Sequence, residues 1–159
     1  MKQAVFLAPA LALAAPAMAD VTRDLASPTA PIANSVLIPP GATTLYLAGS
    51  TPAPINGKTG AEAVFGDTKA QTISTLTRMK AALEKQGFAL GDVVMMRVFL
   101  AGDPAKGGGM DTVGMNEAYR QFFASPDQPK QPARLTVQVV RLANPAWLVE
   151  IDAQAVKAP

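Results

Sequence analysis

Pro132-Ala133-Arg134-Leu135-Thr136-Val137-Gln138-Val139 is a strand-forming stretch with one arginine near its start. Apolar and polar residues alternate after that arginine, which is typical of a strand with two different faces. A second stretch, Trp147-Leu148-Val149-Glu150-Ile151-Asp152-Ala153, carries two carboxylates in the same alternation. Arginine can bind a planar carboxylate through two parallel hydrogen bonds, and a carboxylate can orient or deprotonate water. The two stretches together suggest a sheet that binds a small carboxylic acid.

The segment before these strands predicts a long helix. Apolar residues recur at helical spacing over 68–86, and a capping box of Thr68 with Gln71, or Asp67 alone, fits the helix start. Gly87 follows as a terminating glycine, with Phe88 placed to fold back on the last turn. A second helix is expected to begin at 111 or 112. Strands are expected at 35–38, 44–48, 93–100, 134–142 and 147–156.

These elements follow each other in the order ββαβαββ, which predicts an α+β fold with a mixed sheet and both helices on one face. We expect hairpins between the first two strands and between the last two, the latter joined by 143–146. The strand at 93–100 is nearly all apolar, so we expect it to be central and covered on both faces. The other sheet face is expected to need a second subunit to cover it. The polar residues expected on that face are Thr136, Gln138, Glu150, Asp152 and Gln154.

Residues 1–19 have the features of a cleavable secretory signal. Lys2 is a basic start, an apolar run follows, and Ala17-Met18-Ala19 has the small residues that signal peptidase requires. An uncleaved anchor helix is the alternative, but Pro9 and Pro16 disfavour a continuous helix. We therefore expect a single domain over 20–159 that is periplasmic or secreted, with no membrane contact after cleavage. Loss of Lys2 would reduce the formal charge from +2 to +1.

The composition restricts the chemistry. There is no cysteine and no histidine, which excludes disulfides, thiolate metal sites and nucleophiles activated by histidine. The small net charge and the lack of a basic run argue against a nucleic-acid partner. The absence of histidine and cysteine also removes the usual ligands of transition metals. Catalysis would rest on carboxylates, arginine, lysine, hydroxyls, amides and ordered water.

On spacing alone, the arginine and the two carboxylates fit an ordinary surface ion pair better than a site, because such pairs are common and contribute little. The order of further motifs changes that balance. From about Leu45 to Val156 the chain resembles the RidA/YjgF family of enamine/imine deaminases. The motifs that carry the resemblance are Leu47-Ala48-Gly49, Ala70-Gln71-Thr72, Leu90-Gly91-Asp92-Val93-Val94, Val98-Phe99-Leu100, Met115-Asn116-Glu117-Ala118-Tyr119, Phe122-Phe123, Pro132-Ala133-Arg134, Val137, Val139, Arg141-Leu142 and Val149-Glu150-Ile151-Asp152-Ala153.

The resemblance implies a chorismate-mutase-like fold and a homotrimer with clefts between subunits. It implies hydrolysis of short 2-imino carboxylic acids, which form from enamines, to 2-keto acids and ammonia, without a cofactor. Arg134 matches the arginine that binds the substrate carboxylate. Glu150 matches the glutamate associated with the attacking water, and Asn116 matches an asparagine of the cleft.

Three further positions differ from the family pattern. Thr136 replaces a cysteine that many relatives have, and Ala48 replaces the serine before Gly49. Ala30-Pro31-Ile32 matches a Gly-Pro-Tyr motif, so Ile32 stands where relatives have a tyrosine. Backbone groups near Thr136 and Gly49 are expected to hold the nitrogen end of the substrate.

The expected last hairpin would place Arg134 opposite about Ala155, so that Glu150 lies roughly 17 Å from Arg134. Either this register is wrong or the site combines Arg134 of one subunit with Glu150 of another, and we favour the second interpretation. The alternative function is a non-catalytic trimeric module that binds small carboxylate metabolites or partner proteins. An isomerase that uses the arginine and the carboxylates rests on fold analogy alone.

Overall fold

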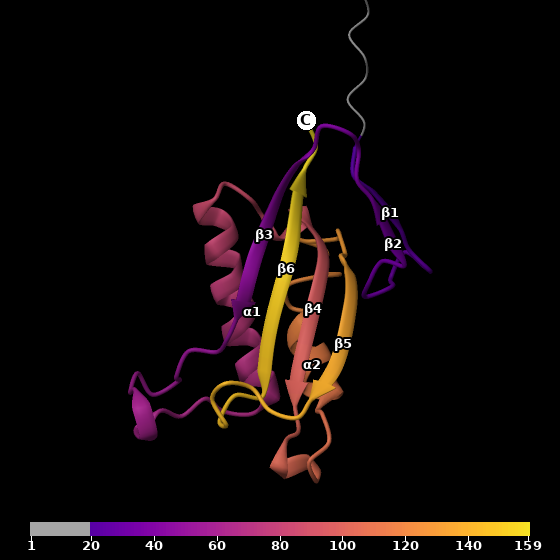
Figure 1. The fold of residues 1–159 in the computed structure, drawn as a ribbon. Coiled ribbons are helices and arrows are strands. Elements are labelled where there is room, and N and C mark those ends of the chain that lie inside the picture. The colour runs from indigo at the N-terminus through magenta and orange to yellow at the C-terminus, as the bar shows by residue number, and fades with distance from the viewer. Residues whose placement is uncertain (1–19) are drawn as a thin grey trace, which may run out of the picture.

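A computed structural model describes residues 20–159 of this protein. Four strands form a mixed sheet in the order β3-β6-β4-β5, and two helices lie along one face of it (Figure 1). A separate two-stranded sheet lies beside β5. The elements are β1 (Thr22–Asp24), β2 (Ser35–Leu37), β3 (Thr43–Ser50), α1 (Thr68–Lys85), β4 (Val93–Ala101), α2 (Thr112–Tyr119), β5 (Ala133–Val139) and β6 (Val149–Lys157). The predicted α+β fold class is confirmed.

Helix α1 begins and ends at the signals that the sequence carries. The Asp67 carboxylate accepts a hydrogen bond from the Ala70 N–H at 2.8 Å, so Asp67 is the cap. Gly87 has a φ of +75°, and the N–H of the next residue, Phe88, donates to the Leu83 carbonyl at 2.9 Å. This is the glycine-terminated end that the sequence predicts.

Gln71 does not form the predicted capping box. Its side-chain nitrogen donates to the Ala146 carbonyl at 3.0 Å, and its side-chain oxygen accepts from the Leu148 N–H at 2.7 Å. Gln71 is only 1% exposed, so these bonds fix the β5–β6 connection against the buried start of α1. Helix α2 is capped by Asp111, whose carboxylate accepts from the Gly114 N–H at 3.0 Å.

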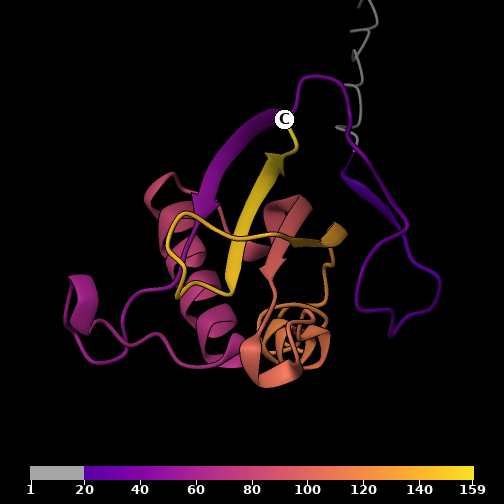
Figure 2. The ribbon, with the colours of Figure 1, turned by 60° about the horizontal axis from the view of Figure 1, so that its bottom comes forward.

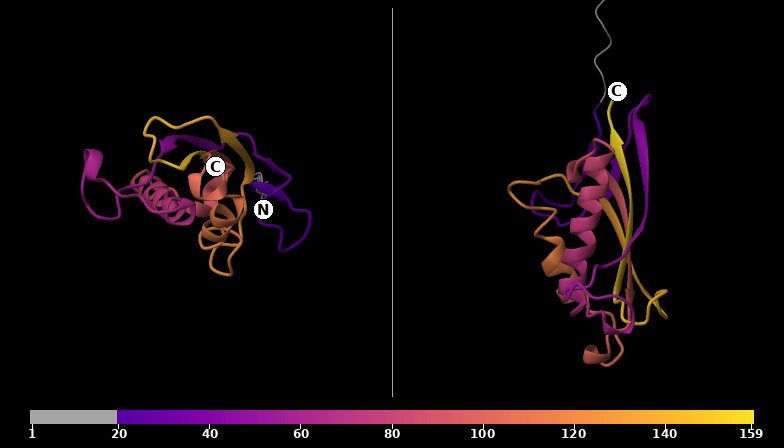
Figure 3. Two further views of the ribbon diagram at one scale, coloured as in Figure 1. Left: turned by 90° about the horizontal axis from the view of Figure 1, so that it is seen from below. Right: turned by 90° about the vertical axis from the view of Figure 1, so that its left-hand side faces the viewer.

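The hydrophobic core lies between the helices and one face of the sheet. Side chains of α1 such as Leu76 and Met79 are fully buried against it, together with Met96 and Val98 of β4 and Ile151 of β6. The right-hand view of Figure 3 shows both helices on the same side of the sheet. Within residues 20–159, no helix combines the length and the apolar composition that crossing a membrane needs.

The other face of the sheet, which we call the open face, carries no helix (Figure 3). Tyr46 is 72% exposed and Leu135 is 47% exposed on it. Arg97, in the middle of β4, is exposed there and forms an ion pair with Asp152 at 2.8 Å. The prediction that β4 is covered on both faces is therefore wrong for a single chain, because only its helix side is buried.

Both predicted hairpins are wrong. Strand β2 pairs with β1 rather than with β3, and β3 pairs with β6. Strand β4 lies between β5 and β6 and runs parallel to β5. The cause is α2: a helix between consecutive strands returns the chain to the same end of the sheet, so β5 becomes a parallel neighbour of β4. The sequence order of the other elements holds, with β1 added where an exposed lead-in was expected.

The segment between β2 and β1 continues along the outer edge of β5. Ala33 forms a parallel bridge with Ala133, and its N–H donates to the Pro132 carbonyl at 3.0 Å. In Figure 2 the β1–β2 sheet and its loop lie on the β5 side, far from the β3–α1 loop on the opposite side. The predicted signal segment, 1–19, lies outside the described residues.

Candidate functional site

Arg134 is the second residue of β5, and its side chain lies on the helix side of the sheet. It pairs across to Met96, a fully buried core residue, which fixes the direction in which it points. Its Nη2 donates to Oδ1 of Asn116 at 2.8 Å, and its Nη1 lies 3.8 Å from the Met115 sulfur. The guanidinium carbon lies 4.4 Å from the centre of the Tyr119 ring. Helix α2 thus surrounds the guanidinium with one amide, one thioether and one aromatic face.

Within residues 20–159, no carboxylate forms an ion pair with Arg134. Burial lowers the pKa of Arg134, and only the weaker influence of Tyr119 raises it. A half-buried cation whose neighbours are an amide and a ring is stabilised by any anion that reaches it. The geometry therefore gives an anion-binding site, and the planar fork favours a carboxylate.

Thr136 lies two residues further along β5 and on the same side as Arg134. It pairs across to Val98, and Val98 pairs to Ile151; both are buried core residues. The prediction that Thr136 points to the open face is therefore wrong. Its hydroxyl is buried and has no hydrogen-bond partner within the described residues. An unpaired buried hydroxyl costs about 1–3 kcal/mol, so a bound group that pairs with it would be favoured.

Gln138 was also expected on the open face, and it too lies on the helix side, because its partner in β4 is the buried Leu100. Its side chain donates to the Gly108 carbonyl at 3.0 Å and accepts from the Met110 N–H at 3.2 Å. Gln138 therefore fastens the β4–α2 loop to the end of β5.

Ile32 is half-buried and packs against the core beside the start of β5. The residues on both sides of it are fixed. The Tyr119 hydroxyl donates to the Pro31 carbonyl at 3.0 Å, and Ala33 pairs with the edge of β5. The structure thus holds the Ile32 segment beside the start of β5, next to Tyr119.

Gly49 and Glu150 form a second group on the open face. A Cβ placed at Gly49 would lie 3.0 Å from the carboxyl carbon of Glu150 and closer still to its Oε1. Only glycine leaves room for this carboxylate, at a point where the β3–β6 register shifts between Leu47 and Ser50. Ala48, also predicted as a site residue, is exposed next to Gly49.

The two carboxylates of β6 differ in their partners. Asp152 is paired with Arg97, whereas Glu150 forms no hydrogen bond or ion pair within residues 20–159. Glu150 is half-buried, so its carboxylate is held near protein groups but remains available to a water. Asp152 therefore pairs β6 with Arg97 of β4, and Glu150 is the carboxylate of the candidate site.

Arg134 and Glu150 are not brought together in one chain. Arg134 is level with Met96 in β4, Glu150 is level with Phe99, and β4 separates their strands. Two strand spacings and three residues give about 14 Å between the two Cα atoms. The two side chains also point to opposite faces. The register assumed for the predicted separation of about 17 Å is wrong, but the two residues are still far apart in one chain, at about 14 Å.

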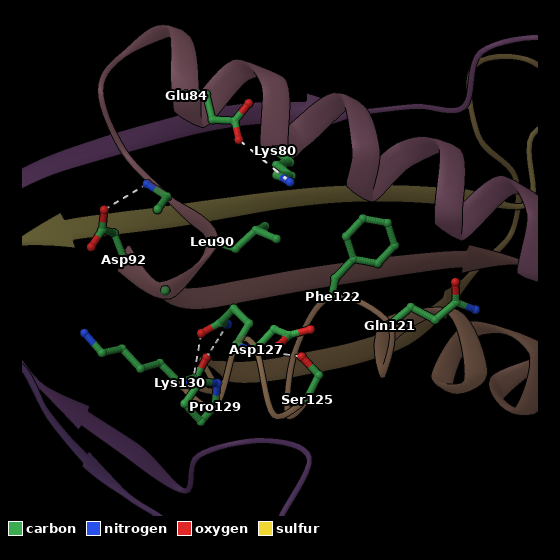
Figure 4. A pocket seen from close by; sticks show the side chains of 13 residues that line it. Lys80, Glu84, Leu90, Asp92, Gln121, Phe122, Ser125, Asp127, Pro129 and Lys130 are labelled. Atoms are coloured by element: carbon green, nitrogen blue, oxygen red, sulfur yellow. Dashed lines mark hydrogen bonds and ion pairs between the residues drawn. The ribbon is translucent and has the colours of Figure 1, made fainter.

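A hollow of about 620 Å³ lies elsewhere, between the second half of α1, the turn before β4 and the loop after α2 (Figure 4). Its lining includes the apolar Leu90 and Phe122 and the charged Lys80 and Asp127. None of the predicted site residues lines it. Within residues 20–159, no cluster of three acidic residues could hold a metal ion.

Tyr119 is a contributor that the sequence motifs do not assign to the site. It is 1% exposed, and its hydroxyl donates to the Pro31 carbonyl. The signal was its spacing from Asn116: residues three apart lie on one helix face, so a side chain near Asn116 also lies near Tyr119.

Comparison with known proteins shows which family the chain is similar to. A family model described as Endoribonuclease L-PSP matches residues 29–157. A RutC family protein of Pyrococcus horikoshii is 41% identical over 115 residues, which cover 71% of this chain and 79% of that protein. TdcF of Escherichia coli, called a reactive intermediate deaminase, is 35% identical over 92 residues, 58% of this chain and 65% of TdcF.

The crystal structure of Escherichia coli TdcF with bound serine aligns with a TM-score of 0.58 and 28% identity, over 86% of this chain and 99% of TdcF. The fold, the order of motifs and the family model thus agree with one another. The chain belongs to the Endoribonuclease L-PSP family, which is the YjgF/RidA family that its sequence motifs resemble.

Proposed function

We propose that this protein hydrolyses short 2-imino carboxylic acids, and the enamines in equilibrium with them, to 2-keto acids and ammonia. The observation that carries the proposal is Arg134: a half-buried guanidinium held by Asn116 and Tyr119, with no carboxylate partner among the residues that the structure describes. The name of TdcF, a reactive intermediate deaminase, and the serine bound in its crystal structure support a small amino-acid-derived ligand here.

The reaction needs positioning more than a strong base. Arg134 would bind the substrate carboxylate through its fork and hold the imine carbon in one place. Glu150 would orient a water and accept one of its protons as the water oxygen bonds to the imine carbon. That proton passes to the nitrogen, which gives a carbinolamine. The remaining hydroxyl proton then passes to the nitrogen by way of Glu150, the C–N bond breaks, and ammonia leaves as the C=O bond forms. The Thr136 hydroxyl is available to pair with the substrate.

We further propose that the site lies between subunits of a homotrimer. The open face carries exposed apolar side chains such as Tyr46 and Leu135, which a second copy would bury. Arg134 and Glu150 lie on opposite faces of one sheet, so a single small acid can contact both only if they come from different chains. Residues of two copies would then complete each site.

The test is the disappearance of an imino acid that an amino-acid oxidase generates in situ. We expect the wild-type protein to accelerate it, and Arg134→Ala to remove most of the acceleration. Arg141→Ala is the matched control, because Arg141 is exposed and forms no ion pair within the described residues. Wild-type protein that leaves the uncatalysed rate unchanged would refute the deaminase proposal. Carboxylate binding by calorimetry in that case would support the non-catalytic module.

A further inference from the structure

We propose that Tyr119 is a positioning residue that couples the arginine grip to the wall formed by Ile32, and so sets which substrate side chains the site accepts. This inference rests on the proposed function, and it names a residue that the sequence motifs did not assign to the site. Tyr119 has two ends, and each end holds a different part of the site.

The ring of Tyr119 fixes the guanidinium. Phe123 stacks on the ring with centroids 5.0 Å apart and planes 17° from parallel. Because Phe123 takes one face, the guanidinium of Arg134, 4.4 Å from the ring centre, takes the other. The attraction between a cation and a ring face is strengthened by burial. With the Asn116 hydrogen bond at its side, the guanidinium has a single orientation.

The hydroxyl of Tyr119 fixes the Ile32 segment. It donates to the Pro31 carbonyl at 3.0 Å, and burial raises the pKa of Tyr119, so the hydroxyl remains protonated and able to donate. Ala33 is anchored on the other side of Ile32 by its bridge to Ala133. Ile32 is therefore held between two fixed residues, and one rigid ring sets its position relative to Arg134.

This arrangement has a consequence for the substrate. Ile32 is half-buried, so part of its branched apolar side chain, which has no hydrogen-bonding group, remains accessible beside the start of β5. An imino acid held by its carboxylate at Arg134 would be selected by the fit of its side chain against Ile32. We infer a preference for branched apolar side chains over the shortest ones, and this preference depends on the Tyr119 hydroxyl.

The variant Tyr119→Phe tests the hydroxyl of Tyr119 independently of its ring, because it keeps the ring and removes the hydroxyl. The unpaired Pro31 carbonyl would loosen the segment, and amide exchange at Ala33 and Asn34 should accelerate about 5- to 30-fold. The ratio of affinities for 3-methyl-2-oxobutanoate and pyruvate, measured by calorimetry, should fall at least threefold, and the affinity for pyruvate should stay within twofold. The matching ratio of kcat/KM for the corresponding imino acids should fall in parallel.

Thr77→Val is the matched control, since it removes another hydroxyl that bonds to a backbone carbonyl, that of Ile73 on the exposed side of α1, and should change neither measurement. Ile32→Ala should lower the same affinity ratio without Tyr119 being altered. Unchanged exchange at Ala33 in Tyr119→Phe, or faster exchange with an unchanged affinity ratio, would overturn the coupling. These binding and exchange measurements do not depend on catalysis. Failure of the deaminase proposal would be detected in a different assay, as disappearance of the imino acid at the uncatalysed rate.

Discussion

The proposed division of the site between subunits predicts that two inactive variants restore activity to each other. In one chain, Arg134 and Glu150 are about 14 Å apart and point to opposite faces of the sheet. If each cleft uses Arg134 of one copy and Glu150 of a neighbour, Arg134→Ala and Glu150→Gln chains complement each other when mixed. Each variant alone should be inactive, because every cleft then lacks one group.

The expected magnitude follows from the symmetry of the assembly. In an equal, random mixture, a cleft is complete when an intact Arg134 meets an intact Glu150, which happens with a probability of about one quarter in a cyclic trimer. The two variants would be unfolded together in urea and refolded, and imino acid disappearance would be compared with refolded wild type. About one quarter of wild-type activity is expected.

A second mixture sharpens the test. Wild type refolded with the Arg134→Ala/Glu150→Gln double variant should also give about one quarter of wild-type activity if clefts are shared, but about one half if each chain has its own site. No activity from the first mixture, combined with one half from the second, would show that both groups act within one chain. The shared cleft would then be wrong.

Three further predictions concern single positions. Gly49→Ala should push the Glu150 carboxylate aside and lower kcat about 100-fold, with an unchanged unfolding midpoint; near-normal kcat would contradict the role of Glu150. Asp67→Ala removes the cap of α1 and should lower the free energy of unfolding in urea by about 1 kcal/mol, whereas the loop residue Asp127→Ala should not. Expression in a bacterial host should give exported protein whose intact mass corresponds to cleavage after Ala19; retention of the full-length mass would refute the signal assignment.

The helices could be predicted from the sequence because their signals are local. Asp67 and Gly87 lie at the two ends of α1 and act on groups within one turn of the helix. Asp67 caps the start and Gly87 ends the helix, as their residue types predict. The partners of Gln71 could not be predicted in the same way. Its bonds reach Ala146 and Leu148, about half the chain away, and only the folded arrangement brings them within 3.0 Å.

The order of the strands in the sheet could not be predicted from the sequence, for a related reason. Asn144 and Pro145 show that the chain turns, but they carry no information on which strand lies between those that they connect. Because β4 lies between β5 and β6, residues of β5 and β6 do not pair with each other, and the alternation along one strand does not show which face the residues of the other occupy. Thr136 and Glu150 were therefore assigned to one face although they occupy opposite faces.

The partners of the charged groups, rather than the charges themselves, separate the site from the scaffold. Glu150 and Asp152 lie two residues apart in β6 and so point to the same face of the sheet. Arg97 and Arg134 both lie in strands next to apolar residues. The structure pairs Arg97 with Asp152 and leaves Arg134 and Glu150 without ionic partners within residues 20–159. Because unpaired charges near protein groups are unfavourable unless something else binds them, the two unpaired groups are the ones positioned to take a carboxylate and a water. In the proposed function, Ile32 and Ala48, which differ from the family pattern, would bear on the fit of the rest of the substrate.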